Sequence, residues 1–74
     1  MEALDIFKAI KDSYASKYNL CMLDMNILIN NACGVGDHSN IMEDITSKIE
    51  ELESYNSKIE FLNNLIYEEK EKGQ

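Results

Sequence analysis

The residues best suited to chemistry gather in one glycine-containing segment near the middle of the chain. Residues 33–40 are Cys-Gly-Val-Gly-Asp-His-Ser-Asn, which places a thiol, a carboxylate, an imidazole and a hydroxyl close together in the sequence. A structural zinc site normally has four ligands in paired short spacings, and nucleophilic catalysis requires a base at a defined distance from the nucleophile. Neither pattern is present, because Cys21 and Cys33 are the two cysteines and His38 is the single histidine. We therefore predict that the protein is not an enzyme and has no catalytic residue, no metal site and no cofactor.

The same segment has a weaker potential as an anion site. Glycines directly before a helix can present backbone N–H groups to a phosphate. However, the lysine of a P-loop does not follow Gly34 and Gly36, and the carboxylate of Asp37 would repel an anion. The favoured interpretation is a turn between two helices, in which glycine tolerates positive φ and polar residues precede the helix. Asp37 and His38 are kept as candidate contacts to a ligand or a partner.

A second candidate site combines aromatic rings with a cation. Lys17 and Tyr18 follow Tyr14 by three and four residues, so a helix places all three on one side. Phenol rings can stack on a nucleotide base while the ammonium group pairs with a phosphate. Tyrosines at such positions more often lie at the edge of a core, with the ring buried and the hydroxyl in water. Nucleotide binding at Tyr14, Lys17 and Tyr18 is therefore the alternative hypothesis.

Two long helices must position these candidates. The chain has no proline and three glycines, two of which lie in the central segment, so it contains one clear break. The first helix is either continuous or interrupted near Tyr18-Asn19, where asparagine could adopt a left-handed turn. We predict an all-α fold, an antiparallel helical hairpin that forms a single domain over residues 1–74, with a helix over 2–32, a turn over 33–39, a helix over 40–70 and a frayed charged tail over 71–74.

Both predicted helices carry a repeat of seven residues that is typical of coiled-coil packing. In the second helix Lys48 occupies a d position, and we expect the adjacent Ile49 to take its place in the core. The a positions of that helix are Ile45, Leu52, Ile59 and Ile66, and its apolar d positions are Ile41, Tyr55 and Leu62. The apolar stripe of the first helix, with one four-residue stutter near Tyr14–Tyr18, consists of Phe7, Ile10, Tyr14, Tyr18, Cys21, Met25, Leu28 and Ala32.

Self-association is expected from size and from the distribution of apolar residues. A chain of 74 residues rarely buries enough apolar surface to be stable alone. Between Leu20 and Ile29 the apolar residues surround the helix almost completely, so a single neighbouring helix cannot cover them. We predict a homo-oligomeric helical bundle, a dimer or larger, whose interface contains Leu20, Leu23, Met25, Leu28, Ile45, Leu52, Ile59, Leu62 and Ile66.

The charge of the chain bears on its partners. The net charge is -7, and the seven lysines are dispersed without any arginine, so direct nucleic-acid binding is not expected. No apolar stretch has the length of about 20 residues that is needed to span a membrane. We expect the protein to be located in the cytoplasm of a bacterium or of a phage-infected host cell. The predicted function is a non-enzymatic interaction module, a regulator or a phage-type inhibitor that binds a basic protein surface. The alternatives are an oligomeric nucleotide binder and a structural scaffold.

Overall fold

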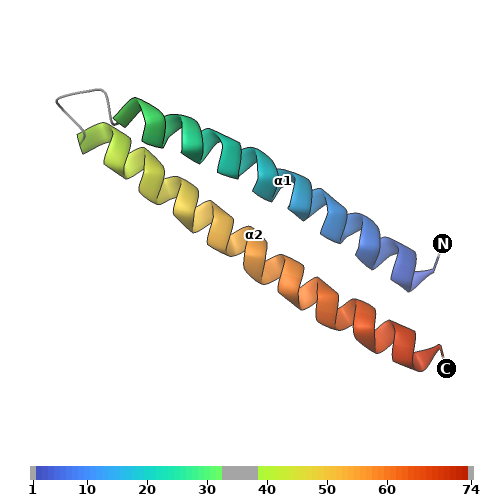
Figure 1. Ribbon diagram of the computed structural model, residues 1–74. Helices are drawn as coiled ribbons and strands as arrows, with labels where there is room; N and C mark the ends of the chain where they lie inside the picture. The colour runs from blue at the N-terminus through green and yellow to red at the C-terminus, as the bar shows by residue number, and fades with distance from the viewer. Residues whose placement is uncertain (1, 33–38, 74) are drawn as a thin grey trace.

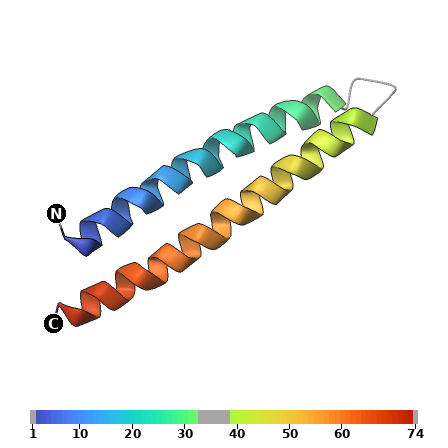
Figure 2. The same ribbon diagram turned by 180° about the vertical axis from the view of Figure 1, so that it is seen from behind.

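The computed structural model describes residues 2–32 and 39–73, and these form two long helices that lie antiparallel (Figure 1). Helix α1 spans Ala3–Ala32 and helix α2 spans Ser39–Lys72. The two helices lie side by side along their length, and the two ends of the chain lie at the same end of the molecule (Figure 2). The molecule is a rod with principal dimensions of 59 × 15 × 13 Å. The predicted all-α hairpin is confirmed.

Helix α1 is helical at every residue between its two ends, so the alternative with an interruption at Tyr18-Asn19 is not observed. Proline and glycine are the residues that most strongly disfavour a helix interior, and neither occurs within α1. The absence of these residues allows thirty residues to form one continuous helix. Continuity matters for the rest of the molecule, because one helix then carries all the side chains that meet α2.

Helix α2 is longer than predicted at its C-terminal end. It extends to Lys72 instead of ending near residue 70, and the N–H of Gly73 donates to the carbonyl oxygen of Glu69 at 3.2 Å. Lys70 and Lys72 lie in the last turn, where positive charge offsets the negative end of the helix dipole. The predicted turn lies outside the described residues except for Ser39, which is the first residue of α2.

The two helices pack through a seam with an uninterrupted seven-residue repeat. Along each helix the positions that face the other helix are separated alternately by three and four residues, as in a coiled coil. We call this set of buried and half-buried residues the seam, and it consists of Leu4, Phe7, Lys11, Tyr14, Tyr18, Cys21, Met25, Leu28 and Ala32 in α1, and of Ile41, Ile45, Lys48, Leu52, Tyr55, Ile59, Leu62, Ile66 and Glu69 in α2.

Two details of the predicted repeat are wrong. Lys11 is half-buried in the seam and Ile10 is 41% exposed, so α1 has no stutter. Likewise Lys48 keeps its d position, and Ile49 is 53% exposed beside it. The physical reason is the same in both helices. A lysine can place its aliphatic stem in a helix interface while its ammonium group remains near water, whereas a shift of register would move every following apolar residue out of the seam.

The core that this seam creates is small. In the described part of the chain, four residues are buried, namely Cys21, Leu52, Leu62 and Ile66. Two helices cover only one side of each other, so apolar residues elsewhere on α1 and α2 stay in contact with solvent. Neither helix, over its described residues, is apolar enough along its length to cross a membrane. The unburied apolar surface is therefore the main feature that a function has to explain.

Candidate functional site

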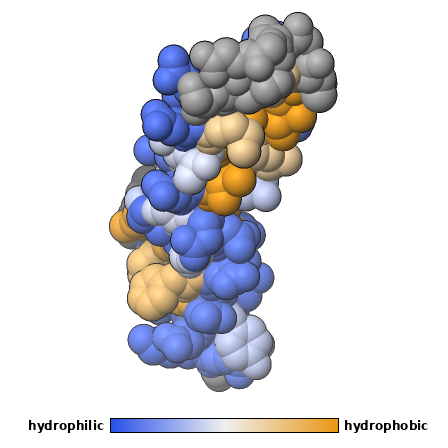
Figure 3. Space-filling view, turned by 90° about the vertical axis from the view of Figure 1, so that its left-hand side faces the viewer, coloured by the Kyte–Doolittle hydropathy of each residue, from blue (hydrophilic) through white to orange (hydrophobic). Residues whose placement is uncertain are grey.

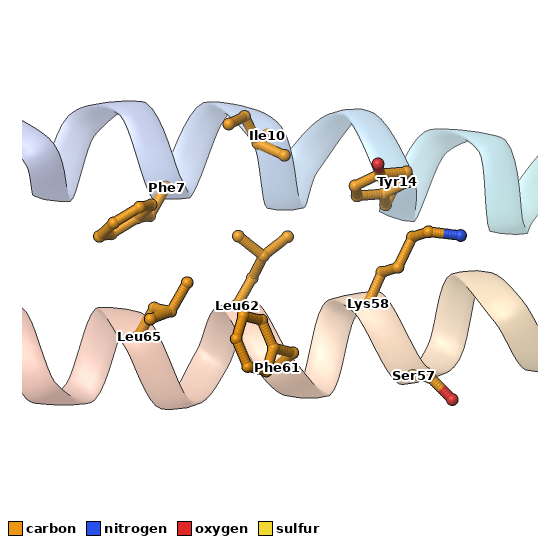
Figure 4. Close-up of a pocket in the computed structure, with 8 residues that line it drawn as sticks. All are labelled: Phe7, Ile10, Tyr14, Ser57, Lys58, Phe61, Leu62 and Leu65. Atoms are coloured by element: carbon orange, nitrogen blue, oxygen red, sulfur yellow. The ribbon is translucent and has the colours of Figure 1, made fainter.

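An apolar groove runs between the helices in the half of the rod that holds the chain ends. Its volume is about 490 Å³. Figure 4 shows Phe7 and Leu62 directed into the space between the helices from opposite sides, whereas the hydroxyl of Ser57 points away from it. Phe61 is 63% exposed although it lines this space. The groove is lined by Phe7, Ile10, Tyr14, Ser57, Lys58, Phe61, Leu62 and Leu65.

The groove differs from its surroundings in charge. Lys58 is the one charged residue in its lining, and no carboxylate takes part. The ammonium group of Lys58 lies 5.6 Å from the centre of the Tyr14 ring, and that of Lys17 lies 5.3 Å from the same ring. Both distances lie within the range of cation–π attraction. The Tyr14 ring in the lining of the groove is therefore approached by two cations.

The predicted group of Tyr14, Lys17 and Tyr18 does not form one site within the hairpin. The ring of Tyr14 packs on Tyr55 across the seam, with centroids 6.2 Å apart and planes inclined by 35°. Tyr18 lines a different depression, which it shares with Ile49 and other residues of α2. Both tyrosines are half-buried seam residues. The favoured interpretation, tyrosines at the edge of a core, describes these positions better than a stacking site for a base.

The candidates in the central segment are not placed by the structure. Asp37 and His38, and also Cys33, lie outside the described residues. Over the residues that are described, no group of three or more histidine, cysteine, aspartate or glutamate side chains is arranged to hold a metal ion. The predicted lack of an enzymatic function stays a prediction.

A polar crossing interrupts the apolar seam in the other half of the rod. The thiol of Cys21 is placed to donate to the Glu51 carboxylate at 3.3 Å and to the carbonyl oxygen of Lys48 at 3.5 Å. The ammonium group of Lys48 lies 3.8 Å from Asp24 and 3.9 Å from Glu51. Burial, and then the adjacent Glu51 carboxylate, raises the pKa of the Cys21 thiol, and Lys48 opposes this only in part. A protonated, buried thiol is a poor nucleophile, so this crossing has a structural role.

The predicted oligomer interface divides into two groups. Leu20, Leu23 and Ile27 are 64%, 57% and 50% exposed on α1, outside the seam. We call these three residues the outer ridge. Leu20 also lines a depression with Lys48 and Glu51 of α2. The space-filling view shows apolar side chains next to the grey segment, surrounded by hydrophilic ones (Figure 3). The other predicted interface residues lie in the seam of their own chain, namely Met25, Leu28, Ile45, Leu52, Ile59, Leu62 and Ile66.

Acidic side chains cover the outside of α2 in the half of the rod that lies next to the predicted turn. Their side chains are exposed, while the lysine of this half, Lys48, is half-buried and lies near Asp24 and Glu51. We call the following five exposed residues the acidic face: Glu43, Asp44, Glu50, Glu51 and Glu53.

Sequence reasoning missed the groove because it considered only the a and d positions. Phe61 and Leu65 are four residues apart, as are Ile6 and Ile10, so each pair forms a short apolar row beside the main stripe. A search for apolar residues flanking the seven-residue repeat would have found them. The groove then follows from the antiparallel pairing, which brings Ile10 of α1 into the same lining as Phe61 and Leu65 of α2.

Comparisons with known proteins add no further assignment. No protein-family model matches the chain, and the searches of curated proteins and of solved structures found no significant match.

Proposed function

We propose that the chain is a small acidic protein–protein interaction module without enzymatic activity, which completes its helical packing by binding protein. One observation carries the proposal, namely that several large apolar side chains outside the seam are half exposed or more. Leu20, Leu23 and Phe61 are three of these residues, with 57–64% of each exposed. Contiguous exposed apolar surface on a small protein typically marks an interaction site. The contacts within one hairpin leave this surface uncovered.

The acidic face supports a more specific form of the proposal, in which the chain is a regulator or inhibitor of a basic protein. Opposite charge across an interface accelerates association and excludes wrong partners. The five residues of the acidic face are exposed, and one of them, Glu51, also accepts from the Cys21 thiol and lies 3.9 Å from Lys48, the lysine within this part of α2. A phage-type inhibitor that occupies the nucleic-acid-binding surface of a host protein is one such regulator.

The electrostatic part can be tested by neutralising the acidic face. The variant carries Glu43→Gln, Glu50→Gln and Glu53→Gln, because glutamine keeps the size and helix propensity of glutamate. The tagged protein is captured from bacterial cells, and co-purifying proteins are quantified by mass spectrometry at low and high salt. We expect a basic protein that is enriched by the wild type, reduced at least about tenfold by the variant, and released by salt.

A matched control removes the same number of charges elsewhere. Asp12→Asn, Glu60→Gln and Glu71→Gln alter three exposed carboxylates that do not belong to the acidic face. This control should retain the partner at the wild-type level. Equal loss of the partner in both variants would contradict recognition by the acidic face, and so would a capture that enriches no basic protein.

A structural assembly is the second candidate function, and the outer ridge favours it. Leu20, Leu23 and Ile27 are exposed outside the seam, so hairpins could associate through these residues as well. Electron microscopy of the purified protein at increasing concentration tests this candidate directly. Rings or filaments that disappear with Leu23→Asp would support a scaffold, and particles that stay small at every concentration would argue against it.

A further inference from the structure

We infer that a second copy of this chain occupies the apolar groove, so that two hairpins form a two-fold symmetric four-helix bundle. The inference rests on the proposed function, because it assigns a protein partner to exposed apolar surface, and it names that partner. The interface it predicts is different from the interface predicted from the sequence. It lies at Phe61, Leu65, Ile10 and Phe7 in the half of the rod that holds the chain ends.

The first argument is the surface area of the chain. The hairpin exposes 5485 Å². A compact monomer of the same mass exposes about 4,700 Å². The excess, about 800 Å², is what each partner contributes to a protein–protein interface of standard size. Packing against one further copy would therefore reduce the exposed area of each chain to about that of a compact monomer.

The second argument is the distribution of charge. Each copy has a net charge of -7, so two copies repel each other unless they meet where carboxylates are absent. The groove lining contains no carboxylate and one lysine. Four other depressions lie on the described residues, and each is lined by at least one aspartate or glutamate, among them Glu50, Asp24, Glu2 and Glu53 respectively. Among these five depressions, the groove is therefore the one whose lining presents no negative charge to a second acidic chain.

The third argument is that the groove face is complementary to itself. Phe61 projects from α2 with 63% of the residue exposed, at the edge of the hollow that the groove forms between the helices. A two-fold axis makes each copy both donor and acceptor of the same contact. The Phe61 ring of each copy can then enter the hollow of the other. A projecting aromatic side chain with an adjacent apolar hollow is the usual form of an interface anchor.

The first test is the molecular mass measured by sedimentation equilibrium over a range of concentrations. We expect the wild type to approach twice the 8.5 kDa of one chain. Phe61→Asp should weaken the dimer at least about 100-fold, because it places an unpaired carboxylate in an apolar interface. Leu23→Asp is the matched control, since Leu23 is 57% exposed on the outer ridge. It should change the dissociation constant less than about threefold. Circular dichroism verifies that both variants remain helical.

The second test does not depend on a destabilising substitution. Phe61 is replaced by the photoreactive aromatic residue p-benzoylphenylalanine, and the irradiated protein is mapped by mass spectrometry. Mixing isotopically light and heavy protein identifies cross-links between copies. We expect cross-links from position 61 to residues near Phe7, Ile10 and Leu65 of the second copy, and no such cross-links from the same photoreactive residue at position 23.

Three results would overturn the inference. These are a monomer at every concentration, a dimer that Leu23→Asp breaks while Phe61→Asp does not, and cross-links from position 61 that never join two copies. A monomer that still captures a basic protein through its acidic face would leave the proposed function in place. Conversely, a groove dimer that captures no basic protein would support the inference and contradict recognition of a basic partner.

Discussion

The thiol of Cys21 lies 3.3 Å from a carboxylate oxygen of Glu51, on the opposite helix. The equivalent position of the next heptad layer is seven residues earlier in α1 and seven residues later in α2. There, Tyr14 lies near Lys58 and packs on Tyr55. Cys21 contacts Lys48 and Glu51, and these residues precede Tyr55 and Lys58 by seven positions. The heptad register is therefore the same in both halves of the rod. The layer at Cys21 is polar, whereas the equivalent layer at Tyr14 is aromatic.

The position of Cys21 predicts a loss of stability at alkaline pH. Its pKa is raised above the ordinary value of 9.0 by burial first and by Glu51 second. The unfolded chain loses the thiol proton at lower pH than the folded chain, so the stabilisation is complete below about pH 9 and declines as the pH rises above that value. The urea concentration at the unfolding midpoint should decrease as the pH is raised from about 9 to about 10.5. Cys21→Ala should show a smaller decrease over the same range, and an equal decrease would contradict this origin.

The same thiol should react slowly with alkylating reagents. The thiolate is the reactive species, and burial with a raised pKa keeps Cys21 protonated and covered. In a Cys33→Ser background, carboxymethylation of Cys21 at neutral pH should be at least about 100-fold slower in native protein than in urea. Mass spectrometry of quenched samples gives both rates. Similar rates in the two conditions would mean that the seam opens readily around Cys21.

Leu52 should be one of the most sensitive positions in the chain. It is 9% exposed and packs in the seam, so Leu52→Ala should lower the free energy of unfolding by about 2–5 kcal/mol. Leu52→Asp should abolish the cooperative thermal transition, because a buried unpaired carboxylate costs several kcal/mol more. Leu23→Ala, at an exposed position, is the control and should change stability by less than about 1 kcal/mol. Thermal unfolding followed by circular dichroism compares the three variants, and equal effects of Leu52→Ala and Leu23→Ala would argue against the described packing.

Replacing Lys11 by leucine should stabilise the hairpin. Lys11 is half-buried in the seam, where an apolar side chain packs without the cost of keeping an ammonium group near water. We expect Lys11→Leu to add about 1 kcal/mol and to raise the melting temperature by about 4–8 °C. Lys8→Leu is the control, since Lys8 is exposed. If Lys8→Leu stabilised the protein more than Lys11→Leu, the register of α1 against α2 would have to be revised.

The helices and their pairing were predictable because their signal is repeated many times. Every heptad of α2 carries an apolar residue at its a position, so no single residue decides the register. The seam of α1 was misassigned at one point, where Ile10 was chosen over Lys11 on hydrophobicity alone. The structure keeps Lys11 in the seam because the repeat on both sides of it requires that position.

The polar crossing and the groove were not predictable in the same way. Each depends on which residue of α1 lies opposite which residue of α2, and the turn length alone does not determine this register. Lys48 lies three residues before Glu51, so that ion pair follows from the helix alone, but the ion pair of Lys48 with Asp24 arises only from the register of the folded hairpin. The groove likewise requires that Phe7 and Phe61 be brought to the same place by two different helices.

The antiparallel arrangement also determines how the molecule responds to mechanical force. Both ends of the chain lie at one end of a rod 59 Å long (Figure 1). A force that pulls these ends apart acts first where Leu4 and Glu69 lie beside each other, and then on each following layer of the seam in turn. A force along the rod, between the chain ends and the predicted turn, instead loads all layers together in shear. The hairpin should therefore peel open under small forces applied at its ends and resist much larger forces applied along its axis.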